Sequence, residues 1–586
     1  MPRIGGVASV QAGQVHTAGV WLGGLERPLA GWLSRPASGS TGSGIVLLPP
    51  VGYPYWCSHR TLRVLAETLA GQGHTVLRID YDGTGDSAGD QWDGARLSAW
   101  RASVRVAVRE LREMELQDLE LPQITLIGAR LGATLALLEA EALAVERVVA
   151  WAPVISGRRY VKATQLLGTE VPQQADPLDP PGTIVSTGSV FSRASLDELA
   201  GLSLEGLSLP SRQRTLVLDA PSARTERWVM SLRERGADVE YRTLLGGEQA
   251  LETPPELGSV PEPIIEAISA WVGSVSQRPG PPARRARSTA SFVWRGTRIH
   301  EEISSFGESG YVGVLSSPPH PDPARSTLVL LNGGSESHVG PGRAWVEYAR
   351  DLAALGYRSV RVDLRGWGES PDGGRAPGRP YDLRGVQDTI EIARALGQCG
   401  HPRVVLMGLC ASAWIALRAV VCAAPVVGAI ALNPQMYWQP GDPVEIDWDQ
   451  IRARREREIR TIQRGQRWHA WDVLDVLGHH HPAASWLEAL SAIGVPVRLL
   501  FSERDDGLLF LEQRLSRRLR RVVDGGRVTV RELAGVDHPM HRAWMRPLVA
   551  AALHEALMGI DIESGAAEHP PRARPQLPAL ELVESR

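Results

Sequence analysis

Short apolar runs alternate along this chain with longer segments whose apolar residues recur at helical spacing. Two alternating stretches within residues 14–34, around Val15 and Trp32, predict the antiparallel edge of a sheet. Residues 45–48 predict a buried strand, residues 58–70 a helix with one apolar face, and residues 75–80 a second strand. Alternation of strand and helix predicts an α/β fold, with a mostly parallel sheet covered by helices on both faces.

The same order of elements returns in the second half of the chain. Strands are predicted at 327–331 and 359–363, on either side of a helix over 343–355. Four positions at the end of the second strand repeat at an offset of 283 residues: Asp80, Gly83, Gly85 and Ser87 correspond to Asp363, Gly366, Gly368 and Ser370. An offset kept through strands, turns and helices indicates duplication of a whole domain.

The duplication divides the chain into two domains of similar size. We expect a first domain over 1–275, a linker over 276–290 rich in proline and arginine, and a second domain over 291–560. In the second domain a cap insertion is expected at 434–495. A loosely ordered tail is expected at 561–586. The total of 586 residues is too long for one hydrophobic core.

The most informative stretch lies in the second half, where an apolar run of strand length begins at Val404 and ends at Gly408 in a tight turn. Gly408 and Ser412 stand two residues before and after Cys410, and helical spacing resumes at Trp414. A strand, a sharp turn between small residues and a helix form a nucleophile elbow. The matching turn of the first half, 280 positions earlier, carries Arg130 where the nucleophile would stand.

A thiol nucleophile needs a base, an acid that orients the base, and donors for an oxyanion. Asp505 follows the strand 497–501 and His538 follows the strand 528–533, in the chain order nucleophile, acid, base. Asp506 and His541 remain alternatives for the acid and the base. The oxyanion donors would be the amide of Ala411 and an amide of Gly333 or Gly334, because glycine lets the backbone approach a ligand closely.

Cys410 could also be a buried, inert thiol, which is a common fate of free cysteine. The coincidence of elbow spacing, acid and base favours the nucleophile. Ser412 could be a displaced nucleophile, but a serine there would lie inside the helix, which favours a small residue that the elbow tolerates.

The first half does not carry this chemistry. Arg130 is permanently cationic and cannot attack a carbonyl. The strand 215–219 is followed by Ala220-Pro221-Ser222, without a carboxylate at the matching place, and no histidine occurs between His74 and His300. We therefore expect a pseudo-hydrolase domain. Arg130 either binds an anionic group, pairs with a carboxylate across a domain interface, or forms a salt bridge within its own half.

Candidate substrate contacts are His338 beside the oxyanion loop, Trp414 after the elbow, and Trp438 in the aromatic-rich cap. Each has a plainer alternative, since aromatic residues in a helical cap often serve packing and His338 could make a structural hydrogen bond. The three adjacent histidines 479–481 favour a cap loop over a metal site, because adjacent side chains rarely converge on one ion. No metal and no cofactor is predicted.

Composition restricts the class of protein and agrees with the two predicted domains. Apolar residues make up 43% and charged residues 22%, as in an ordinary globular protein, and the net charge of −3 argues against a nucleic-acid partner bound through bulk charge. Four cysteines without metal-ligand spacing suit a reducing compartment. We find no signal peptide and no run of about 18 apolar residues, so no membrane association is predicted and a cytoplasmic, soluble protein is expected.

Both halves resemble the α/β-hydrolase superfamily. The first half resembles hydrolase-like proteins of exosortase clusters that carry a Gly-x-Arg-x-Gly turn, here Gly128 to Gly132, with Asp80-Tyr81-Asp82-Gly83 and Trp151-Ala152-Pro153 in support. The second half is similar to their companion family, through Gly408-Leu409-Cys410, Asn332-Gly333-Gly334 and Gly535-Val536-Asp537-His538. One departure is Ala411-Ser412, where those relatives usually have Ser-Gly. The resemblance implies a tandem of two α/β-hydrolase domains.

The sequence thus predicts an acyl hydrolase or acyltransferase. Cys410 would attack an ester or thioester, free or bound to a carrier, and form an acyl-cysteine intermediate. The alternative is a non-catalytic binding or scaffold protein built from two degenerate hydrolase domains. In either case we expect the first half to pack on the second, and a homodimer stays open.

Overall fold

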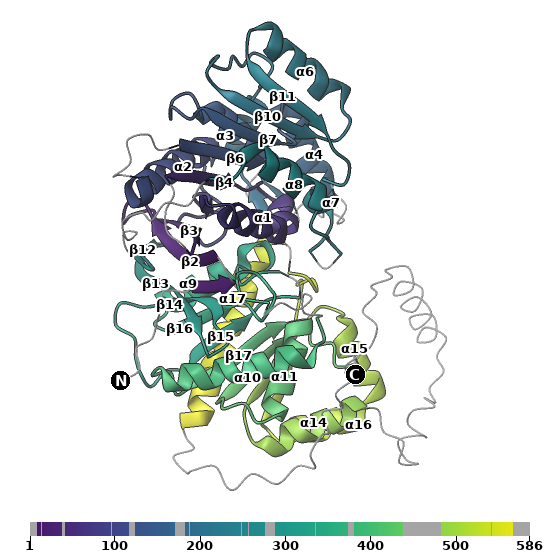
Figure 1. The fold of residues 1–586 in the computed structure, drawn as a ribbon. Helices are drawn as coiled ribbons and strands as arrows, with labels where there is room; N and C mark the ends of the chain where they lie inside the picture. The colour runs from purple at the N-terminus through teal and green to yellow at the C-terminus, as the bar shows by residue number, and fades with distance from the viewer. Residues whose placement is uncertain are drawn as a thin grey trace, which may run out of the picture.

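The computed structural model describes residues 9–12, 15–37, 42–94, 96–116, 123–169, 182–186, 188–247, 249–255, 257–275, 287–334, 336–372, 380–437, 482–540 and 542–565. Two nine-stranded sheets dominate these residues, one in each half of the chain (Figure 1). Their strand orders are β1-β2-β3-β5-β4-β6-β7-β10-β11 and β12-β13-β14-β16-β15-β17-β18-β19-β20. The two orders are the same once the separate hairpin β8–β9 is left out and the strands of each sheet are counted in chain order, as a domain duplication requires.

The first sheet is antiparallel at one end and parallel through the rest. Its strands are β1 (Ser9–Ala12), β2 (Val15–Leu22), β3 (Leu29–Pro36), β4 (Ser43–Leu48), β5 (Thr75–Ile79), β6 (Gln123–Ala129), β7 (Arg147–Trp151), β10 (Arg214–Asp219) and β11 (Asp238–Thr243). The helices are α1 (Tyr53–Gly71), α2 (Arg96–Leu111), α3 (Leu131–Glu139), α4 (Gly157–Thr169), α5 (Arg193–Ala200), α6 (Ala223–Glu234), α7 (Gln249–Glu252) and α8 (Glu262–Val272). A small hairpin, β8 (Ile184–Ser186) and β9 (Ser189–Phe191), lies between β7 and β10 in the chain.

The second half repeats this plan. Its strands are β12 (Thr289–Trp294), β13 (Thr297–Phe306), β14 (Tyr311–Ser317), β15 (Thr327–Leu331), β16 (Arg358–Val362), β17 (Val404–Leu409), β18 (Gly428–Leu432), β19 (Val497–Ser502) and β20 (Val528–Leu533). The helices are α9 (Ala344–Ala354), α10 (Leu383–Gln398), α11 (Ala411–Val421), α14 (Pro482–Ile493), α15 (Asp506–Arg514), α16 (Ser516–Asp524) and α17 (Arg546–Gly565). The central strands are buried along their whole length, which explains their continuous apolar sequence.

Duplication extends to single hydrogen bonds. The hydroxyl of Ser87 donates to the carbonyl of Asp80 at 2.6 Å and accepts from the Ala30 amide at 2.9 Å. The hydroxyl of Ser370 donates to the carbonyl of Asp363 at 2.7 Å and accepts from the Val312 amide at 2.8 Å. The repeated serines therefore do the same work in both halves, since each ties the turn after a parallel strand to the neighbouring antiparallel strand.

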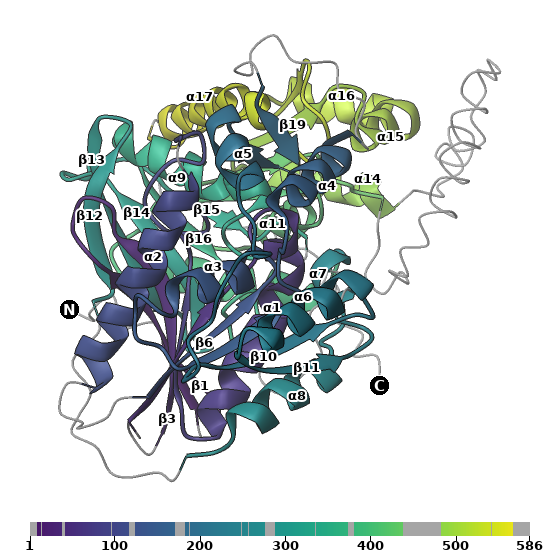
Figure 2. The ribbon, with the colours of Figure 1, turned by 90° about the horizontal axis from the view of Figure 1, so that it is seen from above.

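The halves pack through their antiparallel strands. In Figure 1, β2 and β3 of the first sheet and β12 to β14 of the second lie where the two halves meet. In the view from above, the first half is seen over the second (Figure 2). Trp21 and Trp32 of the first half share one buried apolar cluster with Phe292 and Ile303 of the second. At Gly19 a β-carbon would lie 2.3 Å from the Ile303 side chain, so glycine permits this close approach. The two halves therefore share a hydrophobic core.

Two predicted boundaries differ from the structure. Strand β12 begins at Thr289, inside the predicted linker 276–290. Helix α17 continues to Gly565, so residues 561–565 are helical and not part of a loose tail. Of the predicted cap at 434–495, residues 438–481 lie outside the described residues, and α14 covers much of the remainder. Within the described part of the chain, the helices are too short or too polar to cross a membrane.

Candidate active site

The turn between β17 and α11 holds Cys410 in a strained conformation. Its φ of 55° and ψ of −111° are rare for a residue with a side chain, and its amide donates to the Leu432 carbonyl at 2.9 Å. Gly408 is required because a β-carbon there would lie 2.3 Å from the backbone of Ser412. This is the geometry of a nucleophile elbow, which lifts the side chain above the carboxyl end of the sheet.

Asp505 and His538 meet at the same edge of the sheet. Asp505 is 4% exposed and caps α15, where its Oδ1 accepts from the Gly507 amide at 2.8 Å. Its Oδ2 lies 2.5 Å from Nδ1 of His538, which comes from the loop after β20. The His538 side chain is also close enough to the Cys410 thiol to lower the pKa of that thiol. The structure thus gives His538 the neighbours Asp505 and Cys410, while Asp506 begins the helix.

Asn433, at the end of β18, fixes the two loops relative to each other. Its side-chain amide donates to the His538 carbonyl at 3.0 Å, and its Oδ1 accepts from the Ser502 amide at 2.6 Å. Asn433 is fully buried and has a positive φ of 48°. One side chain therefore sets the position of the His538 loop against the strand that precedes Asp505.

Electrostatics favour an ion pair between Cys410 and His538. Burial alone would raise the pKa of the Cys410 thiol, but hydrogen bonds from His538, Tyr381 and the Ala411 amide outweigh it and lower the pKa. Burial alone would lower the pKa of His538, but its hydrogen bonds to Asp505 and Cys410 raise the pKa. Both shifts favour a thiolate beside an imidazolium, the reactive form of cysteine.

The expected oxyanion donors belong to segments that follow neighbouring strands of the sheet. Ala411 begins α11, and its amide hydrogen-bonds the Cys410 sulfur. Gly333 and Gly334 follow β15, which pairs with β17 beside the elbow. In the part of the chain that the structure describes, these two glycine amides donate to no protein acceptor.

Tyr381 is a site residue that the sequence did not indicate. Its hydroxyl lies 3.5 Å from the Cys410 sulfur and donates to Oε1 of Gln435 at 3.0 Å. Tyr381 precedes Asp382, the residue that caps α10, and nothing in the local pattern marks it as functional. When its proton turns to the sulfur instead, this hydroxyl lowers the pKa of the Cys410 thiol.

The three residues predicted to contact a substrate differ in their surroundings. His338 is 1% exposed and both of its ring nitrogens face carboxylates, which favours the structural alternative. Trp414 is fully buried against Tyr381 and Trp486, so it belongs to the core and not to a pocket wall. Trp438, His541 and the histidines 479–481 lie outside the described residues.

Ser412 has a structural task. Its hydroxyl accepts from the Leu409 amide at 2.9 Å and donates to the Leu409 carbonyl at 3.1 Å. The serine thereby closes the elbow from inside the helix, as the small-residue interpretation expected.

The first half keeps the elbow without its chemistry. Arg130 has φ 51° and ψ −120°, and its amide donates to the Trp151 carbonyl at 2.9 Å, as in the Cys410 turn. Its guanidinium pairs with Glu252 of the same half. Ser222 caps α6 as Asp505 caps α15, so the acid position holds a hydroxyl. Of the alternatives for Arg130, the structure favours a salt bridge within the half.

Comparison with known proteins shows a similarity over part of the second half. Residues 328–551 match the model of the alpha/beta hydrolase family. A segment of 79 residues is 39% identical to a 2-hydroxy-6-oxononadienedioate/2-hydroxy-6-oxononatrienedioate hydrolase of Paraburkholderia phymatum, and it covers 12% of this chain. The chain spans 26% of the length of that relative. Residues 328–551 of the second half are thus similar to the alpha/beta hydrolase family.

The solved structures that are similar over part of this chain include two from bacteria. Est1E of Butyrivibrio proteoclasticus with bound ferulic acid has 16% sequence identity and a TM-score of 0.33, and the alignment covers 43% of this chain and 97% of Est1E. A dienelactone hydrolase of Anabaena variabilis has 14% identity and a TM-score of 0.31, over 44% of this chain and 98% of the hydrolase.

The ion pair leads to a testable pH dependence. Because its pKa is lowered, the Cys410 thiol stays ionised at pH values where an ordinary thiol is protonated. In His538→Ala, burial is opposed only by Tyr381 and Ala411, so the thiol pKa rises. We expect iodoacetamide to label Cys410 at pH 7 at least about tenfold more slowly in this variant, with the difference shrinking as the pH rises. Peptide mapping, with exposed Cys422 as the internal control, measures the rates. Equal rates for Cys410 in both proteins would contradict the ion pair.

Proposed function

We propose that the second half is an acyl hydrolase or acyltransferase that uses Cys410 as nucleophile on an ester or thioester. The observation that supports it most is the meeting of Cys410, on a strained elbow, with His538, which is held at 2.5 Å by Asp505. The order of these residues along the chain is the one expected for this fold.

The proposed reaction has two displacement steps. The Cys410 thiolate attacks the acyl carbonyl, and the resulting oxyanion accepts hydrogen bonds from the amides of Ala411 and of Gly333 or Gly334. His538 gives its proton to the leaving thiol or alcohol as the acyl-cysteine forms. Water or an acceptor then attacks the acyl-cysteine, His538 takes the proton of that nucleophile, and the thiolate leaves.

Sulfur is well suited to thioester exchange. A thiolate paired with imidazolium is a strong nucleophile near neutral pH, and transfer from one thioester to another is nearly isoenergetic. Hydrolysis and transfer use the same residues and differ in whether the closed site admits water. We propose in addition that residues 1–275 form a non-catalytic partner domain, since Arg130 and Ser222 replace the nucleophile and the acid.

The direct test is an adduct on Cys410. Incubation with a panel of acyl-thioesters of different chain length should raise the intact mass by one acyl group, and peptide mapping should place it on the peptide that contains Cys410. The adduct should decay in water or on addition of an amine or alcohol acceptor, which separates hydrolysis from transfer. No adduct and no turnover with any member of the panel would contradict the proposal and favour a binding or scaffold role.

A further inference from the structure

Two equivalent loops, one in each half, contact the opposite half through the same kind of ion pair. Asp86 and Glu369 occupy equivalent positions of the duplication, and so do Arg78 and Arg361. Glu369 of the second half pairs with Arg78 of the first at 2.5 Å, and Asp86 of the first half pairs with Arg361 of the second at 3.3 Å. The interface thus has the self-complementary pattern of a two-fold dimer, fused into one chain.

The reciprocal contacts differ in one respect. Glu369 also pairs with His59, which is on the surface of α1 in the half without a nucleophile. Asp86 also faces Nε2 of His338 at 2.7 Å, in the half that carries Cys410. The opposite nitrogen of His338, Nδ1, lies 2.6 Å from Asp363, and the His338 amide donates to the same carboxylate at 2.6 Å. His338 therefore links a carboxylate of each half.

An imidazole between two carboxylates donates from both nitrogens and must be protonated. The charged groups around it come from several elements: Asp363 and Arg361 at the end of β16, Glu301 on β13, Arg350 on α9, and Asp80 and Asp86 on the first half. Burial alone would lower the pKa of His338, but Asp363 and Asp86 raise it well above its ordinary value. The imidazolium consequently persists through neutral pH.

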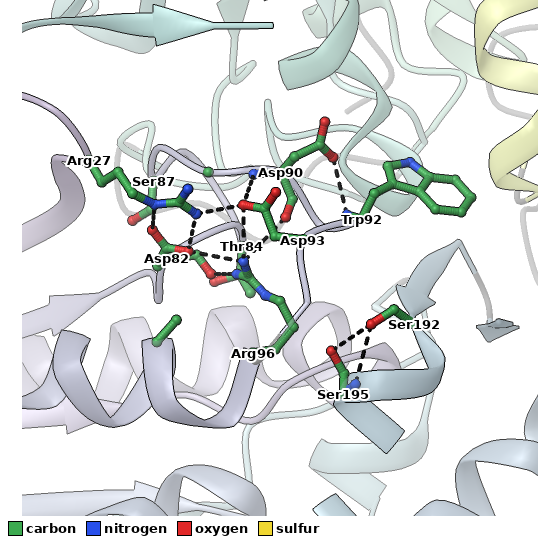
Figure 3. Close-up of polar contacts among 12 residues, drawn as sticks. Arg27, Asp82, Thr84, Ser87, Asp90, Trp92, Asp93, Arg96, Ser192 and Ser195 are labelled. Carbon is green, nitrogen blue, oxygen red and sulfur yellow. Dashed lines mark hydrogen bonds and ion pairs between the residues drawn. The ribbon is translucent and has the colours of Figure 1, made fainter. Parts of the chain in front are cut away.

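The loop that carries Asp86 is itself held firmly. Figure 3 shows Arg27 bridging Asp82 and Asp93, each at 2.6 Å, with Arg96 adding a contact of 3.0 Å to Asp82. On its other side the loop is bound by the second half, since Arg343 donates to the Gly85 carbonyl at 2.8 Å and Arg350 to that of Asp86 at 2.6 Å. These contacts thus fix the position of Asp86 beside His338.

His338 in turn anchors the segment that carries the glycine amides proposed as oxyanion donors. The segment from Asn332 to His338 is held at its start by the Leu364 amide, which donates to Asn332 Oδ1 at 3.1 Å. It is held at its end by His338 on Asp363. Both anchors lie at the end of β16, and Gly333 and Gly334 lie between them. The position of these two amides therefore depends on the contact between His338 and Asp363.

We propose that Asp86, although it belongs to the half without a nucleophile, is a positioning residue for the glycine amides of the active half, acting through His338. The inference rests on the proposed function, in which these amides bind an oxyanion. It assigns the first half a task in catalysis: a carboxylate supplied across the interface keeps the oxyanion loop in place.

The matched variants are Asp86→Asn and Glu369→Gln. Each removes one buried interface carboxylate and keeps the size of the side chain, but only Asp86 faces His338. With asparagine at 86, His338 loses a charge that favours its protonation. Above neutral pH the ring is neutral, so Nδ1–H can still donate to Asp363 while Nε2 only accepts, from the asparagine side-chain amide at position 86. A charge-assisted contact is then replaced by a weaker neutral one.

We expect the kcat of Asp86→Asn for an acyl-thioester to fall about tenfold at pH 8 with KM within about twofold, because a misplaced donor affects the transition state more than binding. The loss should shrink as the pH falls and His338 is protonated again. Glu369→Gln should keep kcat within about twofold and gain no pH-dependent phase. A merely structural role of the interface would affect both variants alike and would overturn the proposal.

Hydrogen exchange provides a second measurement that needs no turnover. Amides of residues 336–343 should exchange faster in Asp86→Asn than in the unchanged protein, while Glu369→Gln should speed exchange around Tyr55 and His59 instead. Unchanged exchange of 336–343 in Asp86→Asn, with both variants folded by thermal melting, would overturn the inference. If the unchanged protein shows no turnover that depends on Cys410, the proposed function fails, and the exchange comparison still decides whether Asp86 holds the loop.

Discussion

Replacing Cys410 by alanine should lower the turnover of an acyl-thioester by at least about a thousandfold, because removal of a nucleophile leaves only the contribution of binding and oxyanion donors. The thiol is only partly buried and its side chain is small, so the stability of the fold should change by less than about 1 kcal/mol. Initial rates with a chromogenic thioester and a thermal melt of each protein measure the two effects.

Two controls separate the nucleophile from its surroundings. Cys422→Ala removes an exposed thiol outside the site and should leave the rate unchanged. Ser412→Ala removes a hydroxyl that bonds the Leu409 backbone, so it should lower stability by about 1 kcal/mol and slow turnover far less than Cys410→Ala does. A Cys410→Ala protein that keeps a tenth of the rate, or a Ser412→Ala protein that loses all of it, would exclude Cys410 as the nucleophile.

Most of the fold could be predicted from local pattern because buried parallel strands leave a clear apolar run. Strands 327–331 and 528–533 have the predicted bounds, and the repeat at 283 positions predicted two equivalent domains. The last turn of α17 could not be predicted, since it depends on contacts with distant strands. Asp561 accepts from Ser326 and Glu563 pairs with Arg498, and neither contact has a signature in the residues 561–565 themselves.

The candidate site also contains some residues that could be predicted from the sequence and others that could not. Asp505 and His538 could be found because this fold delivers acid and base from fixed strand ends, in a fixed chain order. His338 could not be assigned a partner, because Asp86 lies 252 positions away, in the other half of the duplication. Tyr381 was missed for a similar reason: only the packed structure brings the residue before α10 against the elbow. The sequence thus predicts the site residues that the strand order brings together. The side chains that hold them in place could not be predicted, because tertiary packing brings them from distant parts of the chain.

The buried charge cluster between the halves should carry a large share of the stability of the second half. Glu301 is fully buried, with Oε2 at 2.8 Å from Arg350 and Oε1 at 3.2 Å from Arg361. Glu301→Gln leaves two buried guanidinium groups short of a counter-charge and should lower the free energy of unfolding by about 3–5 kcal/mol. Glu302→Gln, at the next and partly exposed position of the same strand, should cost less than about 0.5 kcal/mol.

A urea titration followed by circular dichroism measures both variants, and its pH dependence tests the cause. Burial alone would raise the pKa of Glu301, but Arg350 and Arg361 lower it. A carboxyl group with a lowered pKa contributes stability above its unfolded-state pKa and loses it as the pH falls through the folded-state value. The gap between the unchanged protein and Glu301→Gln should therefore be full at pH 7 and narrow in acid. Because Arg350 also donates to the Asp86 carbonyl, loss of Glu301 should speed exchange in residues 336–343 as well. Equal urea midpoints for Glu301→Gln and Glu302→Gln would show that this cluster does not stabilise the joined halves.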